Sequence, residues 1–211
     1  MKVQKFTFNP FQENTFVVYD DSKECVIVDA GCYFPEEFDT LNSFIVSNGL
    51  KPVKLISTHS HLDHVFGNYK VINTLNIPLG IHHEDEQTLN MLRRTADLYQ
   101  IPNVFESPKP DFYFEHGDRV EFGYSSFEVR FVPGHAPGHV VFVSHEDQFV
   151  INGDCLFAGS IGRTDLPGGD HATLIRSIQE QLFTLPDDYK VYCGHGPETT
   201  IGVEKTTNPF F

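Results

Sequence analysis

The feature that most constrains the fold is a dense polar segment, STHSHLDHVFGN, at residues Ser57–Asn68. It places three histidines and one aspartate between positions 59 and 64, just after the apolar run VKLI. A short continuous apolar run is typical of a strand buried on both faces of an α/β sheet. Because sites in such sheets gather at the carboxyl ends of strands, we expect this segment to emerge at such an end.

The spacing of these four side chains indicates metal binding. His59 and His61 are two residues apart, so in an extended loop they project to the same side. Asp63 and His64 are adjacent and diverge unless the backbone turns, which suits two neighbouring ions better than one. Imidazole and carboxylate groups are suitable ligands for zinc, iron, manganese or cobalt. The alternative is a polar loop whose histidines serve no ion.

Three further segments place a histidine or aspartate after an apolar run. His135 lies in FVPGHAPGHVVFV, Asp154 in VINGDCLF and His195 in VYCGHGPE. A single histidine or aspartate beside glycine is more often just a turn residue. Two metal ions, however, need about seven or eight protein ligands, and these segments supply the number that the first motif lacks.

The order of expected elements favours an α/β fold. Strands are expected at residues 2–8, 14–20, 24–31, 53–58, 77–82, 118–123, 125–133, 139–144, 148–153 and 189–196. Helices are expected at 35–50, 68–76, 84–100 and 170–185, with a short one in the tail 199–211 and a surface loop at 101–111. Two similar halves, each a mixed sheet with outer helices, would form a single domain over residues 1–211, a four-layer αββα sandwich.

Composition narrows the function. The formal net charge of −14 repels phosphate backbones, so we expect no nucleic-acid partner. No run approaches the roughly 18–20 apolar residues of a membrane span, so we expect no membrane partner. The first residues, MKVQKFTFNPFQENTF, lack the apolar stretch and cleavage site of a secretory signal, so we expect a cytoplasmic location. The four cysteines form no C-x-x-C pair and are expected to be free thiols.

Four motifs taken in order, THSHLDH, PGHAPGH, NGDCLF and CGHG, resemble the metallo-β-lactamase superfamily and within it the short, single-domain glyoxalase II-like (hydroxyacylglutathione hydrolase-like) branch. The resemblance covers nearly the whole chain and implies the αββα fold. It also implies two divalent ions, zinc being expected and iron or manganese the alternatives. The implied ligands are His59, His61 and His135 for one ion, Asp63, His64 and His195 for the other, and Asp154 as the bridge between them.

The implied reaction is cleavage of a small thioester such as S-lactoylglutathione. Two divalent ions can supply hydroxide near neutral pH and polarise the carbonyl. Asp63 would be the catalytic residue that orients the hydroxide and takes its proton. A thiolate is a good leaving group, so no strong general acid is required. Arg163, in the segment GSIGRTDLPGGDH, could bind a substrate carboxylate or pair with Asp165.

The sequence differs from the glyoxalase II pattern in ways that leave other functions open. The chain ends before the C-terminal helical domain of full-length glyoxalase II, and GRTDLPGG replaces a tyrosine-containing loop, so another thiol than glutathione is possible. The main rival is a mononuclear iron persulfide dioxygenase, which would use the positions of His59, His135 and Asp154. A non-hydrolytic metal-binding or redox module is a further alternative. A true β-lactamase or an RNA-processing nuclease is less expected.

The remaining histidines and cysteines receive lesser roles. His139 either orients a ligand or packs beneath the site. His82 and His83 are expected to be structural, and His171 to follow a helix cap at Asp170. Cys155 and Cys193, which lie next to predicted ligands, are not assigned to metal.

Overall fold

The computed structural model describes all residues from Met1 to Phe211 and contains two six-stranded sheets. The first has the order β1 (Lys2–Phe8), β2 (Glu13–Tyr19), β3 (Glu24–Val28), β4 (Lys51–Ile56), β5 (Leu79–His82) and β6 (Phe112–Phe114). The second has the order β14 (Thr199–Thr200), β13 (Lys190–Cys193), β10 (Phe149–Gly153), β9 (Val140–Ser144), β8 (Ser125–Phe131) and β7 (Arg119–Phe122). A small hairpin, β11 (Leu156–Phe157) with β12 (Ser160–Ile161), completes the strands.

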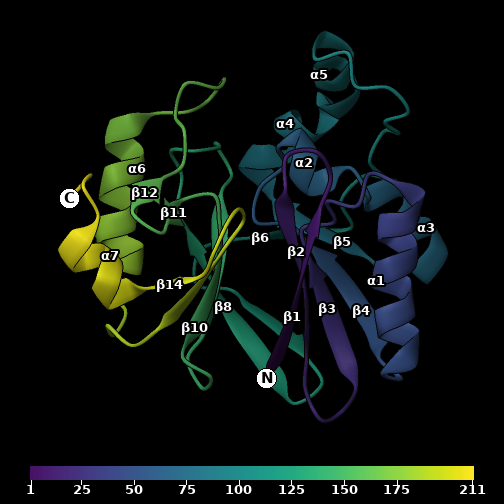
Figure 1. The fold of residues 1–211 in the computed structure, drawn as a ribbon, viewed down its shortest axis with the longest axis horizontal. Coiled ribbons are helices and arrows are strands. Elements are labelled where there is room, and N and C mark those ends of the chain that lie inside the picture. Colours follow the sequence, from purple (N-terminus) through teal and green to yellow (C-terminus); the bar gives the residue numbers. More distant parts are fainter.

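The two sheets face each other across an aromatic core. Phe16 and Val28 of the first sheet pack in one cluster with Phe127, Phe142 and Ile151 of the second. The outer faces are covered by helices, α1 (Pro35–Ser47) and α3 (Asn68–Leu75) on the first sheet and α6 (His171–Ser177) and α7 (Ile201–Thr207) on the second (Figure 1). The predicted αββα sandwich is therefore confirmed.

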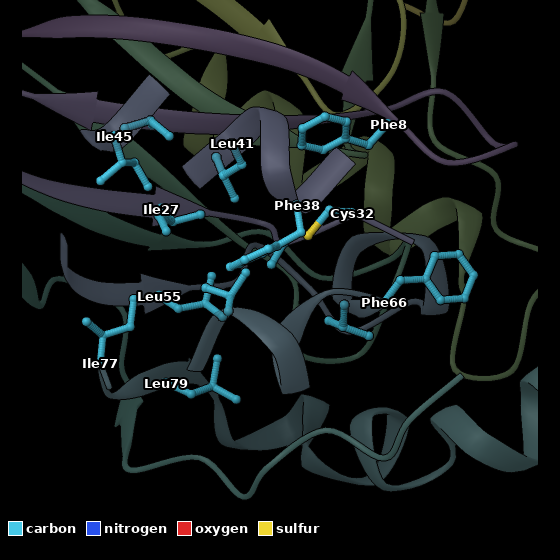
Figure 2. Close-up of a cluster of buried hydrophobic side chains, with 14 of the residues drawn as sticks. Phe8, Ile27, Cys32, Phe38, Leu41, Ile45, Leu55, Phe66, Ile77 and Leu79 are labelled. Carbon is cyan, nitrogen blue, oxygen red and sulfur yellow. The ribbon is translucent and has the colours of Figure 1, made fainter. Parts of the chain in front are cut away.

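Alternation along single strands explains this layering. In β3, Val26 and Val28 point into the core between the sheets, whereas Cys25 and Ile27 point to the helical face. A strand covered on both sides must be apolar at every position, which is why the sequence shows continuous runs here. Figure 2 shows the helical side of the first sheet, where Leu41 and Ile45 of α1 lie close to Ile27.

Helix α1 has its predicted start and stop. Pro35 occupies the first turn, and the Glu37 carboxylate accepts hydrogen bonds from the backbone N–H groups of Tyr33 and Phe34, at 2.7 and 3.0 Å. Gly49 ends the helix in the left-handed region with φ +63°.

The structure corrects several predicted elements. The helix expected at 84–100 is divided into a 3₁₀ turn, η1 (His83–Asp85), and two helices, α4 (Glu86–Asn90) and α5 (Leu92–Leu98), that meet at Met91. The helix expected at 170–185 changes from α6 into the π-helical turn η2 (Ile178–Leu182). The strand β6 and the one-turn helix α2 (Leu62–Val65) were not predicted, because three or four residues are too few to show a period. None of the helices combines the length and apolar character that a bilayer span requires.

Candidate metal centre

Seven predicted residues from five segments meet at one end of the sandwich. His59 and His61 follow β4, Asp63 and His64 lie on α2, and His135, Asp154 and His195 follow β8, β10 and β13. The four-residue helix α2 supplies the turn that lets adjacent residues share a site, because the Oδ2 atom of Asp63 lies 3.9 Å from Nε2 of His64. The structure thus brings together every metal-ligating residue expected from the sequence.

The first set of possible ligands is His59, His61 and His135. Nε2 of His135 lies 2.9 Å from Nδ1 of His61 and 3.2 Å from Nε2 of His59. Nitrogens that bind one zinc ion tetrahedrally at about 2.0–2.1 Å are separated by about 3.3 Å, so the spacing is close to that of a metal site. Burial lowers the pKa of His61 to about 3, and it also places the pKa of His59 well below its ordinary value. Both imidazoles are therefore neutral at neutral pH, as metal ligation requires.

Hydrogen bonds fix the tautomers of two of these rings. Nδ1–H of His135 donates to the backbone carbonyl of Arg163 at 2.8 Å. Nδ1–H of His59 donates to the Thr58 hydroxyl at 3.1 Å, because that hydroxyl gives its own proton to Asp29 at 2.7 Å. The lone pairs on the two Nε2 atoms consequently face each other at 3.2 Å, and a cation between them would turn repulsion into ligation.

The second set is Asp63, His64 and His195. Nε2 of His195 lies 3.2 Å from Oδ2 of Asp63. Nδ1–H of His64 donates to Asp29 at 3.1 Å, and Nδ1–H of His195 donates to the carbonyls of Phe11 and Gln12 at 3.1 and 3.2 Å. Each Nε2 atom therefore points into the site.

Protonation distinguishes the second set from the first. Burial opposes a positive charge on His64, but the carboxylates of Asp154 and Asp63 outweigh burial and raise its pKa well above the ordinary value. Burial also opposes a charge on His195, but the hydrogen bond with Asp63 and the charges of Asp154 and Asp63 together outweigh it and raise the pKa of His195. An ion that enters this set must displace those protons.

Asp154 faces both sets. Its carboxylate lies 3.5 Å from Nε2 of His64, 3.4 Å from Nε2 of His195 and 3.7 Å from Nε2 of His135. Burial raises the pKa of Asp154, but the charges of the neighbouring histidines, His64 above all, more than reverse this effect, so the group stays ionised. The buried atoms His64 Nε2 and Asp154 Oδ1 have no hydrogen-bond partner. Orphaned buried polar atoms are costly, and a divalent ion would satisfy both.

Asp29 is a supporting residue that sequence reasoning missed. It is fully buried after β3 and accepts hydrogen bonds from the backbone N–H and the hydroxyl of Thr58, both at 2.7 Å. With Nδ1 of His64 as a third partner, its carboxylate sets the tautomer of one ligand in each set. Its position after the apolar run ECVIV is the same strand-end signal that identified Asp154.

His139 supports the bridge rather than an ion. Its Nε2 accepts the backbone N–H of Asp154 at 3.0 Å, and Nδ1 lies 3.4 Å from the thiol of Cys155. Burial keeps its pKa well below the ordinary value, so the ring is neutral and able to accept. Of the two roles predicted for His139, the geometry favours orientation of a ligand residue.

Two more side chains near the site, Asn9 and Glu13, were also missed from the sequence. Asn9 donates from Nδ2 to the carbonyls of Asp63 and Gly31, at 2.9 and 2.8 Å, and so holds the start of α2. Glu13 is fully buried with its Oε1 atom 3.9 Å from Nδ1 of His64. Burial raises the pKa of Glu13 well above its ordinary value. Neither residue belongs to a histidine or glycine motif that would have marked it.

The other candidate residues lie outside the cluster. The Arg163 guanidinium is exposed and makes a two-point ion pair with Asp165 at 2.7 and 2.8 Å. His82 is buried and stacks on Phe131 with ring centroids 4.3 Å apart, whereas His83 forms ion pairs with Glu84 and Glu115. Asp170 caps α6 as expected, through the N–H of Thr173. All four cysteines are free and buried.

The fold and the cluster together define a metal-dependent hydrolase class. Residues 8–195 match the family described as the metallo-beta-lactamase superfamily, and the chain belongs to that superfamily. Proteins of this class are hydrolases that bind divalent metal ions, as the sequence motifs predicted.

Several relatives match over nearly their whole length. The chain is 36% identical to hydroxyacylglutathione hydrolase GloC of Haemophilus influenzae, covering 100% of this chain and 98% of that one. It is 35% identical to the probable metallo-hydrolase YqgX of Bacillus subtilis, with 100% and 97% covered. Among solved structures it is similar to the BLEG-1 B3 metallo-beta-lactamase (34% identity, TM-score 0.90, 99% of both chains). It is also similar to TTHA1623 in a di-iron-bound form (37%, 0.89, 99% and 100%).

Proposed function

We propose that the protein is a dinuclear metallo-hydrolase that cleaves a small thioester such as S-lactoylglutathione. The observation that carries this proposal is the pair of converging ligand sets with Asp154 between them and with two orphaned buried atoms, His64 Nε2 and Asp154 Oδ1. His59, His61 and His135 would hold one ion, and Asp63, His64 and His195 the other. Two ions explain why seven ligand residues converge where four would satisfy one.

The chemistry follows from the roles of the side chains. Bound divalent ions lower the pKa of water to about 7 and polarise a carbonyl oxygen. Asp63 lies at the rim of the cluster with Oδ2 against Nε2 of His195, where it can accept the proton of an attacking water. The leaving group of a thioester is a stable thiolate, and the cluster contains no separate strong acid that would protonate a poorer leaving group.

The substrate class rests on the relatives. The Haemophilus relative is named a hydroxyacylglutathione hydrolase and is similar over 98% of its length, which supports a glutathione thioester or a related small thioester. Arg163 is the proposed contact for a substrate carboxylate, and such a carboxylate would have to compete with Asp165 for the guanidinium. We therefore expect Arg163→Ala to raise KM several-fold and to leave kcat nearly unchanged.

Zinc is the proposed metal, with iron or manganese as alternatives. Imidazole and carboxylate ligands accept all three, and the di-iron form of TTHA1623 supports iron as a candidate. We also propose a cytoplasmic location, where a small-molecule thioester would be the partner.

The test combines metal analysis with three substrates. We expect about two ions per chain and hydrolysis of S-lactoylglutathione measured by release of the free thiol. One iron per chain with oxygen uptake on glutathione persulfide would overturn the proposal in favour of the dioxygenase. A chromogenic β-lactam is the third substrate because of the similarity to BLEG-1. Hydrolysis of that compound alone would replace the thioester as the proposed substrate.

A further inference from the structure

Asp85 is a buried carboxylate close to the metal centre that no sequence motif marks. It is the last residue of η1, directly before α4, and has no accessible surface. It occupies the N-cap position of α4, where an aspartate ordinarily accepts a backbone N–H of its own helix. Its side chain forms no such capping bond. The carboxylate is therefore used for something other than helix capping.

The carboxylate joins two loops from different halves of the sandwich. Oδ2 accepts the backbone N–H of Ser60, and Oδ1 accepts the backbone N–H of Gly138 at 3.0 Å. Ser60 lies between His59 and His61 after the first sheet, whereas Gly138 lies three residues after His135 in the loop from the second sheet. One side chain thus bridges the two loops that supply the first ligand set.

The contact between the Gly138 loop and Asp85 is very close. A Cβ atom placed on Gly138 would lie 2.5 Å from the backbone nitrogen of Asp85. Only glycine allows this approach, and the approach brings its N–H within hydrogen-bonding distance of the carboxylate. The one additional partner is the hydroxyl of Thr88, at 3.4 Å from Oδ1.

We propose that Asp85 is a positioning residue that holds His135 against His59 and His61 and thereby closes the first metal position. This inference rests on the proposed metal centre. The second position does not depend on Asp85, because the ring orientations of His64 and His195 are set by Asp29 and by the carbonyls of Phe11 and Gln12. Loss of Asp85 therefore weakens one position and spares the other.

The test measures bound zinc and its affinity by competition with a chromophoric chelator. Asp85→Ala is expected to lower affinity at one position about 10–100-fold, the usual effect of removing a partner that orients a ligand. Asp85→Asn is expected to be intermediate, because an amide has one acceptor oxygen for two N–H donors. Thr88→Ala is the matched control, since it removes only the hydroxyl partner and should bind zinc as the wild type does.

Double variants assign the affected position. Asp85→Ala combined with His195→Ala should leave no tight site, whereas Asp85→Ala combined with His61→Ala should retain the same single site as His61→Ala alone. Equal weakening of both positions by Asp85→Ala, or no weakening, would overturn the inference. Cooperative melting of the metal-free Asp85→Ala protein separates a positioning role from loss of the fold.

Failure of the dinuclear proposal gives a different result. If the wild type binds one ion, the dinuclear proposal fails. The Asp85 inference then requires that the single ion be lost in His61→Ala and bound 10–100-fold more weakly in Asp85→Ala. An unchanged affinity in Asp85→Ala would refute the positioning role even in that case.

Discussion

Replacement of Asp29 by asparagine should switch the tautomers of His59 and His64 without removing either ring. The amide is nearly isosteric with the carboxylate, but it can accept through one oxygen only. If that oxygen keeps the N–H of Thr58, the amide NH₂ faces Nδ1 of His64 and the hydroxyl of Thr58. His64 must then accept at Nδ1, and the reoriented hydroxyl donates to Nδ1 of His59. Both rings carry their proton on Nε2, where the ions would bind.

The size of the effect follows from the number of rings affected. Loss of one orienting partner costs about 10–100-fold in metal affinity. Two rings, one in each ligand set, give about 10²–10⁴-fold if the effects are independent, or about 3–6 kcal/mol at 1.4 kcal/mol per tenfold. The effect should divide between the two positions, because His59 and His64 belong to different sets.

The assay is a chelator competition on Asp29→Asn and two variants of Thr58. Thr58→Val removes the hydroxyl that accepts from His59 and should weaken one position by about 10–100-fold. Thr58→Ser keeps the hydroxyl and should bind zinc as the wild type does. Retention of both ions by Asp29→Asn within threefold of wild-type affinity would refute the tautomer argument.

Three further predictions concern positioning, the core and pH. His139→Ala removes the acceptor for the N–H of Asp154 and leaves a cavity, so urea unfolding of the metal-free protein should show a loss of about 2–4 kcal/mol, and an unchanged midpoint would contradict this role. Phe142→Ala empties a fully buried site between the sheets and should cost about 3–5 kcal/mol in the same assay; a cost under about 1 kcal/mol would show that the core there is not close-packed. Burial raises the pKa of Asp20, but hydrogen bonds from Ser22 and Ser125 outweigh it and leave the pKa below its ordinary value. A lowered folded-state pKa stabilises the protein above the ordinary pKa of about 4, and this contribution disappears as the pH falls through the folded-state value. The difference in unfolding free energy between wild type and Asp20→Ala should therefore be constant from pH 7 to 5 and become smaller below pH 4. A difference that grows in acid would contradict the lowered pKa of Asp20.

The candidate metal cluster could be predicted because most of its residues come shortly after an apolar strand. His59, His135, Asp154 and His195 all lie just after strands whose carboxyl ends meet at one edge. Asp29 obeys the same rule and could have been found by it. The rule works because a buried strand must end at a loop, and several such loops converge at one end of the sandwich.

Asp85 could not be found in this way. An acidic residue at the start of an amphipathic helix is expected to interact with the helix N-terminus, and nothing local indicates that its carboxylate points away. Its partners, Ser60 and Gly138, are 25 and 53 residues distant in the chain. Only the packing of the two halves brings these backbone N–H groups to one carboxylate.

The break in the helix predicted at 84–100 has a related origin. Leu89 and Leu92 are both buried against the first sheet, and their three-residue spacing satisfied the helical pattern. The structure keeps both residues in the core while the chain changes course at Met91. The spacing of apolar residues shows which side chains are buried. It does not show a break in the helix when the residues on both sides of the break stay buried.

The most direct test of the two-metal account is the metal content of Asp154→Ala beside the wild type, measured after excess metal is removed. Asp154 faces both ligand sets, so its loss should disturb both positions at once. We predict about two ions per chain in the wild type, fewer than one in the variant, and no thioester hydrolysis by the variant. Full metal content together with undiminished hydrolysis in Asp154→Ala would contradict the account.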